Sequence, residues 1–276
     1  MTIHSITKVL SLPLILILAA MLYNGWSSGN QLSIYLIIPV ALLVALYTFH
    51  GVIDHWWLTK FPVPFDPKLK DWLTKYFPPY VVLDDELKKK FEFRLGLYLN
   101  GRLFQSVGKE MRDVPEDIKC MVAAHAVNMT LGIDDYLIGD TDRIFLYKHP
   151  FPTTKFPFLH NVETDTEDGV IILSLEQLVN AIIRPDLYYN TAYHAYAEAI
   201  MFVNNKTEFP SFPEQTWSDI QNISGWNNET ICRQTGFQSV PLQTVHSTIF
   251  FTMPQKYKMI LPEYYDRLSL AFNRKP

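Results

Sequence analysis

The chain is organised around residues 170–204, VIILSLEQLVNAIIRPDLYYNTAYHAYAEAIMFVN. Its opening run, Val170–Leu173, is β-branched except for the final leucine, and it predicts a buried strand. Ser174, with Gln177 three residues later, has the spacing of a capping box, so a helix is expected to follow. A second helix is expected over residues 186–203. It is apolar almost all round, which predicts a position deep in the core.

This second helix carries two ionisable side chains. His194 and Glu198 are four residues apart, a spacing that places both on one face of a helix. A histidine and a carboxylate among apolar residues need polar partners. The simplest interpretation is that the two side chains form an intrahelical hydrogen-bonded pair.

Composition limits the classes of protein that fit. The 276 residues leave room for one domain of ordinary size plus appendages, and a hydrophobic content of 48% with 14% aromatics predicts a large core. The net charge of −4 and the lack of a long basic run give no case for a nucleic-acid partner. The two cysteines, Cys120 and Cys232, are too few for a disulfide framework and are interpreted as thiols in a reducing compartment.

Residues 1–50 predict a two-helix hairpin in a lipid bilayer. The apolar runs are Val9–Tyr23 and Leu32–Phe49, and a span takes about 17–25 residues. A signal peptide is the alternative for the first run. Lys8 precedes the first run and lysines follow the second, whereas residues 24–31 carry no charge. This bias predicts an integral membrane protein whose soluble domain faces the cytoplasm.

The rest of the chain predicts an α+β domain that is mainly helical with a small sheet. Residues 51–81 are expected to form a juxtamembrane linker, although an ordinary helix packed on the domain fits Pro67–Tyr76 equally well. The domain itself is expected over residues 82–276. Helices are predicted at 84–105, 115–131, 240–251 and 262–273, a strand at 143–147, a loop at 150–167, and an irregular connection at 204–238 with a short helix near 214–220.

These elements resemble the zinc-dependent peptidases of the Mlc titration factor A type. The resemblance begins with the strand, helix, proline turn and Asn190-x-x-x-His194 of the central stretch. It extends over residues 82–276, excludes the membrane hairpin, and implies a zincin-like fold. Further motifs that carry it are Ala123-Ala124-His125-Ala126, Leu131-Gly132, Ile144–Tyr147 and the final segment LPEYYDRLSLAFNRKP, residues 261–276.

The resemblance also implies a degenerate metal site. In the family the second helix carries His-Glu-x-x-His, and here His194 stands at the first zinc histidine. Ala195 replaces the glutamate that serves as general base, and Glu198 replaces the second histidine. Thr248 stands where the family has its third ligand, a glutamate on a later helix. The implied site is therefore a remnant pocket of His194, Ala195, Glu198 and Thr248, with no catalytic residue among them and no cofactor expected.

A shuffled zinc site is the main alternative. It would use His194, Glu198 and His246 as ligands, with zinc as cofactor, in an active metallopeptidase. His246 is two residues from Thr248, about 200° of helical rotation, so it is expected to face away from a pocket that Thr248 lines. Of the other histidines, His125 is interpreted as a core residue and His160 as a surface or loop residue, with the rim of the active site as an alternative.

The leading hypothesis is a membrane-anchored pseudoenzyme that binds a protein or peptide in a regulatory or scaffolding role. A structural subunit of a membrane complex is a further alternative. The sequence contains no motif for other catalytic chemistries: it has no glycine-rich phosphate loop, no Cys-x-x-Cys and no Gly-x-Ser-x-Gly element.

Overall fold

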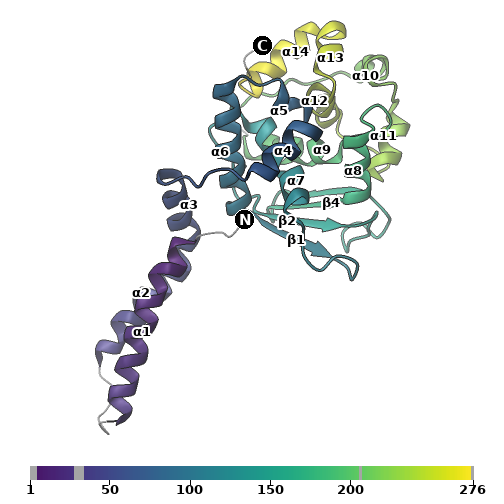
Figure 1. The fold of residues 1–276 in the computed structure, drawn as a ribbon. Helices are drawn as coiled ribbons and strands as arrows, with labels where there is room; N and C mark the ends of the chain where they lie inside the picture. The colour runs from purple at the N-terminus through teal and green to yellow at the C-terminus, as the bar shows by residue number, and fades with distance from the viewer. Residues whose placement is uncertain (1–4, 28–33, 205–206, 275–276) are drawn as a thin grey trace. The chain divides into compact units, whose positions relative to one another are not determined.

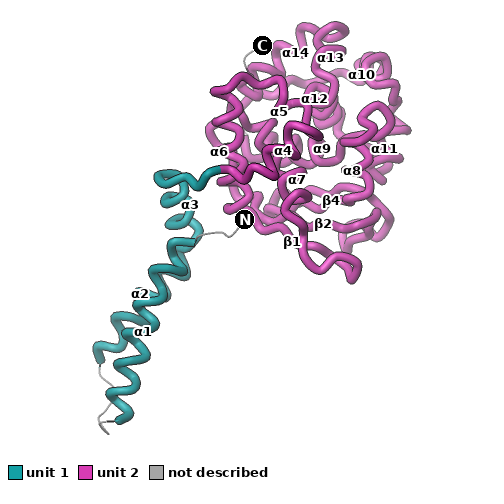
Figure 2. Tube along the Cα trace, in the orientation of Figure 1, with its two compact units in different colours: residues 1–64 teal, residues 65–276 magenta. Residues whose placement is uncertain are grey.

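The structure, a computed structural model, describes residues 5–27, 34–204 and 207–274, and it divides into two compact units. The first unit comprises residues 1–64 and the second residues 65–276, coloured separately in Figure 2. The sequence suggested boundaries after residues 50 and 81 instead. Residues 65–81 belong to the second unit, because α4 (Pro67–Tyr76) buries Leu69 and Leu73 in its core.

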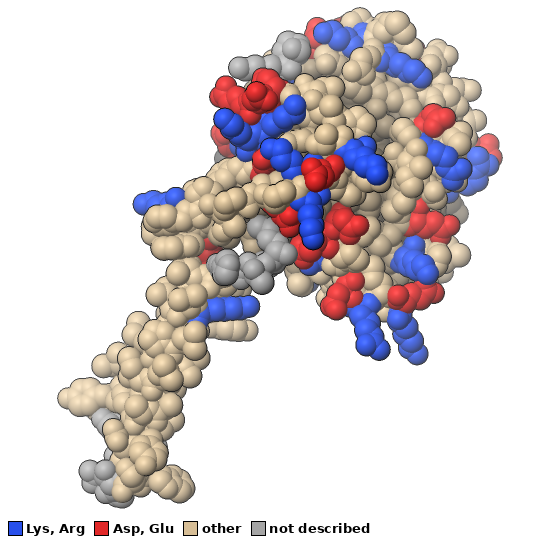
Figure 3. Space-filling view, in the orientation of Figure 1, with Lys and Arg blue, Asp and Glu red and all other residues tan. Residues whose placement is uncertain are grey.

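The first unit contains one clear candidate membrane helix. Helix α1 (Ile6–Ser27) has 22 residues, a length of roughly 33 Å, which matches the hydrocarbon core of a bilayer. Its side chains are almost all uncharged in the space-filling view (Figure 3). The first of the two expected spans therefore lies in a helix that is long and apolar enough to cross a membrane.

The prediction of a second continuous span is wrong. The 3₁₀ turn Ile34–Leu36 leads into α2 (Ile37–Thr48), which has only 12 residues and a length of roughly 18 Å. The chain then bends by 70° into α3 (His50–Lys60). The two helices amount to a span only if they are taken together as a bent pair. Residues 28–33, which include the start of the expected second span, lie outside the described part.

The Asp54 carboxylate connects the start of α1 with α3 in the first unit. Asp54 on α3 accepts hydrogen bonds from the Ser5 hydroxyl at 2.6 Å and from the Thr7 hydroxyl and backbone N–H at 3.0 Å each. These groups lie at the start of α1, where N–H groups have no partner within the helix and a negative charge is favourable. The interaction is an N-cap supplied by another helix, and it fixes the first turn of α1 to α3.

The second unit is a mixed α+β domain, as expected, with helices in the majority and one small sheet (Figure 1). The sheet has the order β1-β2-β4-β3, in which the first three strands are parallel and β3 is antiparallel at the edge. The strands are β1 (Leu103–Val107), β2 (Arg143–Tyr147), β3 (Val162–Asp165) and β4 (Val170–Ser174). Two of them, β2 and β4, confirm the predicted strands.

Burial alternates along the strands and shows which face of the sheet the helices cover. Ile144 and Leu146 of β2 are fully buried, whereas Arg143 at the start of the strand is exposed and Phe145 is half-buried. Ile171 and Leu173 of β4 are likewise fully buried. Because successive side chains point to opposite faces, the helical core lies against one face only.

The helices of the second unit that follow α4 are α5 (Pro78–Val81), α6 (Asp85–Gly101), α7 (Glu116–Thr130), α8 (Leu175–Ile183), α9 (Thr191–Val203), α10 (Trp217–Ser224), α11 (Asn228–Thr235), α12 (Leu242–Thr252), α13 (Pro254–Ile260) and α14 (Pro262–Ala271).

Several predicted element boundaries are wrong for local reasons. The helix expected to reach residue 105 ends at Gly101, and β1 follows it. The capping box at Ser174 does not form: the Ser174 hydroxyl is buried without a hydrogen-bond partner among the described residues, and Gln177 bonds the Tyr189 carbonyl instead. The connection over 204–238 is less irregular than expected, since it contains the turn Glu214–Thr216, α10 and α11.

Candidate functional site

Helix α9 positions the candidate site. It begins at Thr191 rather than at residue 186, because Asn190 caps it by accepting a hydrogen bond from the Tyr193 N–H at 3.0 Å. It packs against α7, α12 and β3. Its buried residues face all directions, as expected: Thr191, Ala192, Tyr193, His194, Ala195, Tyr196, Ala197, Ala199 and Ile200.

Both ring nitrogens of His194 have protein partners. The side chain is only 3% exposed, and its Nε2 lies 3.4 Å from Glu198 Oε1. Its Nδ1 lies 2.9 Å from the Tyr189 hydroxyl. An ionised carboxylate only accepts hydrogen bonds, so Nε2 carries a proton, while Nδ1 shares a hydrogen bond with the Tyr189 hydroxyl. The expected His194–Glu198 pair is therefore present, with Tyr189 as a third member.

Glu198 is held in its ionised form. Burial by itself raises the pKa of the Glu198 carboxyl, but the charge and hydrogen bond of His194 outweigh it, with a smaller contribution from Thr164. The net result is a pKa below the ordinary value for glutamate. A carboxylate that is ionised and paired with an imidazole is therefore available beside β3 at neutral pH.

A cavity of about 220 Å³ opens beside this pair. Helix α9 contributes His194 and Glu198, and edge strand β3 contributes Thr164 on the same side. The Thr164 hydroxyl is buried and lies near Glu198, yet it makes no hydrogen bond of ordinary geometry with the described residues. The remaining lining residues come from β3 and two loops: Lys155, Phe156, Val162, Glu163, Phe237, Ser239, Val240 and Pro241.

Two members of the expected remnant pocket do not line this cavity. Ala195 and Thr248 are fully buried in the core, and the Thr248 hydroxyl donates to the Thr244 carbonyl at 2.8 Å. The Tyr189 hydroxyl lies beside Thr248 as well as bonding His194. Tyr189 thus connects the position expected for the first ligand with that expected for the third. Burial raises the pKa of the Tyr189 hydroxyl well above its usual value, so the group stays protonated.

His246 is engaged elsewhere. Its Nε2 lies 2.9 Å from the Thr216 hydroxyl and its Nδ1 lies 2.7 Å from the Tyr257 hydroxyl. Thr216 already donates to the Pro213 carbonyl, so it accepts from Nε2–H, and Tyr257 donates to Nδ1. The ring also stacks on Phe212 with centroids 3.7 Å apart. Every polar atom of this imidazole is therefore satisfied in the neutral form.

This neutral form predicts a dependence of stability on pH. Burial lowers the pKa of His246 to about 3, below its value of 6.5 in an unfolded chain, so below pH 6.5 the unfolded chain binds more protons. Stability should fall as pH decreases, by about 2 kcal/mol between pH 7 and pH 5 for this group. Urea unfolding at the two pH values measures the change. His246→Gln should reduce the difference, and an unchanged difference would contradict the assignment.

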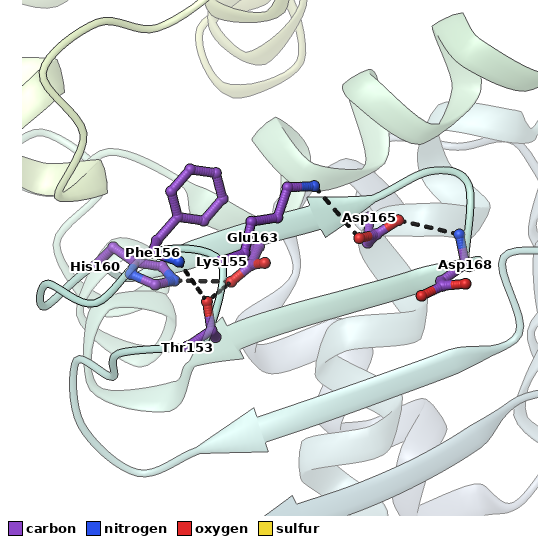
Figure 4. Close-up of polar contacts among 7 residues, drawn as sticks. All are labelled: Thr153, Lys155, Phe156, His160, Glu163, Asp165 and Asp168. Carbon is purple, nitrogen blue, oxygen red and sulfur yellow. Dashed lines mark hydrogen bonds and ion pairs between the residues drawn. The ribbon is translucent and has the colours of Figure 1, made fainter.

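The histidine expected on a loop is also buried. His160 is 0% exposed, and its Nε2 lies 3.1 Å from Glu163 Oε2 on β3. Thr153 donates to the same carboxylate oxygen at 2.8 Å, as Figure 4 shows. The prediction of a surface position is wrong, because the side chain is fully buried, whereas the loop position is correct, since His160 lies outside the named helices and strands. Its partner Glu163 lines the cavity beside Glu198, but His160 itself does not.

Metal binding requires several ligands in one place. Among residues 5–27, 34–204 and 207–274, no group of three or more His, Cys, Asp or Glu side chains is placed to hold a metal ion. The alternative ligand set His194, Glu198 and His246 is thus not assembled in the described residues. Zinc would have to displace the Nε2–Glu198 contact or the Tyr189 hydrogen bond to reach a nitrogen of His194.

The contacts of His194 follow the order of a catalytic triad, carboxylate–imidazole–hydroxyl, without the access that catalysis needs. Glu198, His194 and Tyr189 are linked in that order. Tyr189 is fully buried and does not line the cavity, so its hydroxyl is not positioned to attack a substrate. The cavity presents to a ligand the ionised Glu198 carboxylate, the Lys155 ammonium and the Thr164 hydroxyl, which has no hydrogen-bond partner among the described residues.

No protein-family model matches the chain, and the search of curated proteins finds no match either. The likeness to Mlc titration factor A type peptidases therefore stays a prediction from the motifs.

Proposed function

We propose that the second unit is a zincin-like domain, related to the Mlc titration factor A type peptidases, that has lost catalysis and binds an extended protein or peptide segment. The first unit anchors it to the cytoplasmic face of a membrane through α1. The role is regulatory or scaffolding rather than hydrolytic. The observation that carries this proposal is the saturation of both ring nitrogens of His194 by Glu198 and Tyr189.

The loss of catalysis is argued from the groups around His194. A catalytic zinc site needs three protein ligands, an open position for water and a carboxylate base. Position 195 carries a buried alanine in place of the base, and position 248 carries a threonine bonded within its own helix. Helices α9 and α12 do pack together, which supports the retention of the scaffold. Of the three ligands and the base that the family uses, only His194 is retained.

The binding of an extended segment is argued from β3. This strand ends the sheet order, so its outer side is not paired with another described strand. Edge strands offer free backbone donors and acceptors to a segment that joins the sheet. The cavity lies directly beside it, with apolar walls at Phe237 and Val240, and with Thr164 as a polar group that has no hydrogen-bond partner in the described part of the chain. A peptide paired with β3 would place alternate side chains in this cavity.

Metal analysis of the purified full-length chain tests the loss of catalysis. We expect no stoichiometric zinc after exposure to a slight excess of the metal, and no peptide cleavage that a chelator inhibits. His194→Ala should leave both results unchanged. His149→Ala, which removes an exposed histidine, is the matched control.

Two results would contradict the proposed loss of catalysis. One zinc per chain that is retained in His149→Ala and lost in His194→Ala would overturn the proposal and establish the active metallopeptidase. Chelator-sensitive cleavage by the wild-type chain would do the same.

A further inference from the structure

A second cavity, of about 250 Å³, shares no lining residue with the cavity beside β3. It lies among α4, α5, α7, α8, α9, α12, α13 and the C-terminal residues of the described chain. Its lining residues are Tyr76, Phe77, Pro78, Pro79, Val82, His125, Asn128, Ala181, Ile182, Pro185, Asn190, Tyr193, Phe251, Thr252, Pro254, Gln255 and Arg274. Most are apolar, and the polar ones come from α7, the start of α9, α12, α13 and the C-terminal residues.

Arg274 is the one charged side chain among these lining residues. Its guanidinium Nη2 donates to Asn128 Oδ1 at 3.3 Å, and the group lies 4.8 Å from the centre of the Phe251 ring. No carboxylate of the described residues forms an ion pair with it. Burial lowers the pKa of Arg274, but an arginine keeps its charge in proteins. Among the described residues, the half-buried guanidinium is therefore contacted by a neutral amide and an aromatic face, with no carboxylate to balance its charge.

The other polar groups of the cavity are neutral and fixed by one another. His125 donates from Nδ1 to the Met121 carbonyl at 2.8 Å and accepts at Nε2 from the Asn190 amide at 3.0 Å. Asn128 donates to the Tyr193 hydroxyl at 2.6 Å. His125, Asn128 and Asn190 are each at most 5% exposed. None supplies a negative charge, so the local charge balance of the site is positive.

We propose that this cavity binds a small organic acid, whose carboxylate pairs with Arg274 and whose apolar part fills the space lined by Phe77, Ile182 and Phe251. Arginine and carboxylate form a charge-assisted, bidentate pair that is stronger than the present bond to an amide. The volume lies between that of an engineered cavity of about 150 Å³ that holds benzene and the lower limit of about 300 Å³ for drug-sized sites. A single aromatic ring on a short chain has the matching size.

Isothermal titration calorimetry of the full chain in detergent tests the proposal, with 3-phenylpropionate as probe and 3-phenylpropan-1-ol as its neutral analogue. The acid should bind at least about tenfold more tightly than the alcohol. Arg274→Gln should abolish this preference. Arg267→Gln, which removes a cation on α14 outside the cavity, should preserve it.

A second variant keeps Arg274 and gives its guanidinium a carboxylate partner within the protein. Asn128→Asp places a carboxylate at the position of the amide that now bonds Arg274, and its second oxygen can accept from the Tyr193 hydroxyl. This internal anion should compete with the ligand and reduce the affinity for the acid at least about tenfold while the chain stays folded. If Arg274→Gln fails to fold, the Asn128→Asp variant alone tests whether the acid pairs with Arg274.

Three results would overturn the proposal: equal affinity for the acid and the alcohol, unchanged acid binding in Arg274→Gln or Asn128→Asp, or no binding of the acid at millimolar concentration. Because neither zinc nor the cavity beside β3 enters this experiment, its outcome is independent of the function proposed above.

Discussion

Replacing Gly132 by alanine is expected to destabilise the second unit by about 3 kcal/mol. A Cβ atom on Gly132 would lie 1.9 Å from the Asn273 carbonyl oxygen and 2.8 Å from that of Phe272. Both neighbours are backbone atoms, so relief requires movement of the chain rather than rotation of a side chain. The Gly132 carbonyl also accepts from the Asn273 amide at 2.7 Å, which holds the two segments together.

The matched control for this substitution is Gly96→Ala. Gly96 lies inside α6, and a Cβ there would meet nothing within 4 Å. Alanine in a helix interior is favoured over glycine by about 1 kcal/mol, so this variant should be stabilised or unchanged. Urea midpoints of the two variants in detergent provide the comparison. Equal stability of Gly132→Ala and the wild type would mean that the contact with Asn273 is absent in solution.

Removal of the Glu163 carboxylate is the second large effect, and we expect Glu163→Ala to cost about 3 kcal/mol. His160 and Glu163 are 0% and 7% exposed, so their pair is shielded from water. His160 Nδ1 lies 2.9 Å from the Phe158 carbonyl, which only accepts, and therefore carries a hydrogen. Without Glu163, Nε2 of the ring and the Thr153 hydroxyl would lose their partner.

Glu163→Gln distinguishes the two ways in which the pair can hold its proton. If the ring is neutral, the glutamine amide can donate to Nε2 and its carbonyl can accept from Thr153, and the loss should stay below about 1 kcal/mol. If the ring is an imidazolium, the variant should lose nearly as much as Glu163→Ala. Asp168→Asn, at an exposed carboxylate on the turn that follows β3, is the control and should stay within about 0.5 kcal/mol. A wild-type urea midpoint for Glu163→Ala would refute the buried pair.

The sequence predicted the elements that carry a strong periodic signal. Strands β2 and β4 are runs of aliphatic residues, and helices α7 and α9 are long and apolar, so both their type and their place were predicted. Strands β1 and β3 were missed. Their segments, Leu-Phe-Gln-Ser-Val and Val-Glu-Thr-Asp, are short, and they lie at the two edges of the sheet, where one side needs no apolar partner. Pairing with their neighbours, rather than their composition, makes them strands.

The candidate site was predictable only as far as contacts are local. The spacing of His194 and Glu198 predicts their pair, because four residues form one turn of a helix. The contact of Tyr189 with His194 depends on the turn over residues 184–190 and has no such signature. The bond of His160 to Glu163 required β3, which the pattern did not indicate. Asn190 offered a usable signal, since asparagine before a helical run is a preferred cap.

The position of Arg274 has a practical consequence for anyone who purifies this protein. The residue follows α14 and is held by its backbone bond to the Ser269 carbonyl and by Asn273 against Gly132. The residues after Asn273 lie outside every helix and strand and outside the His194–Glu198 pair, yet their proteolytic removal would take away the cation of the second cavity. A trimmed preparation that stays folded would bind acids and alcohols with the same affinity, so intact mass should be verified before any ligand is titrated.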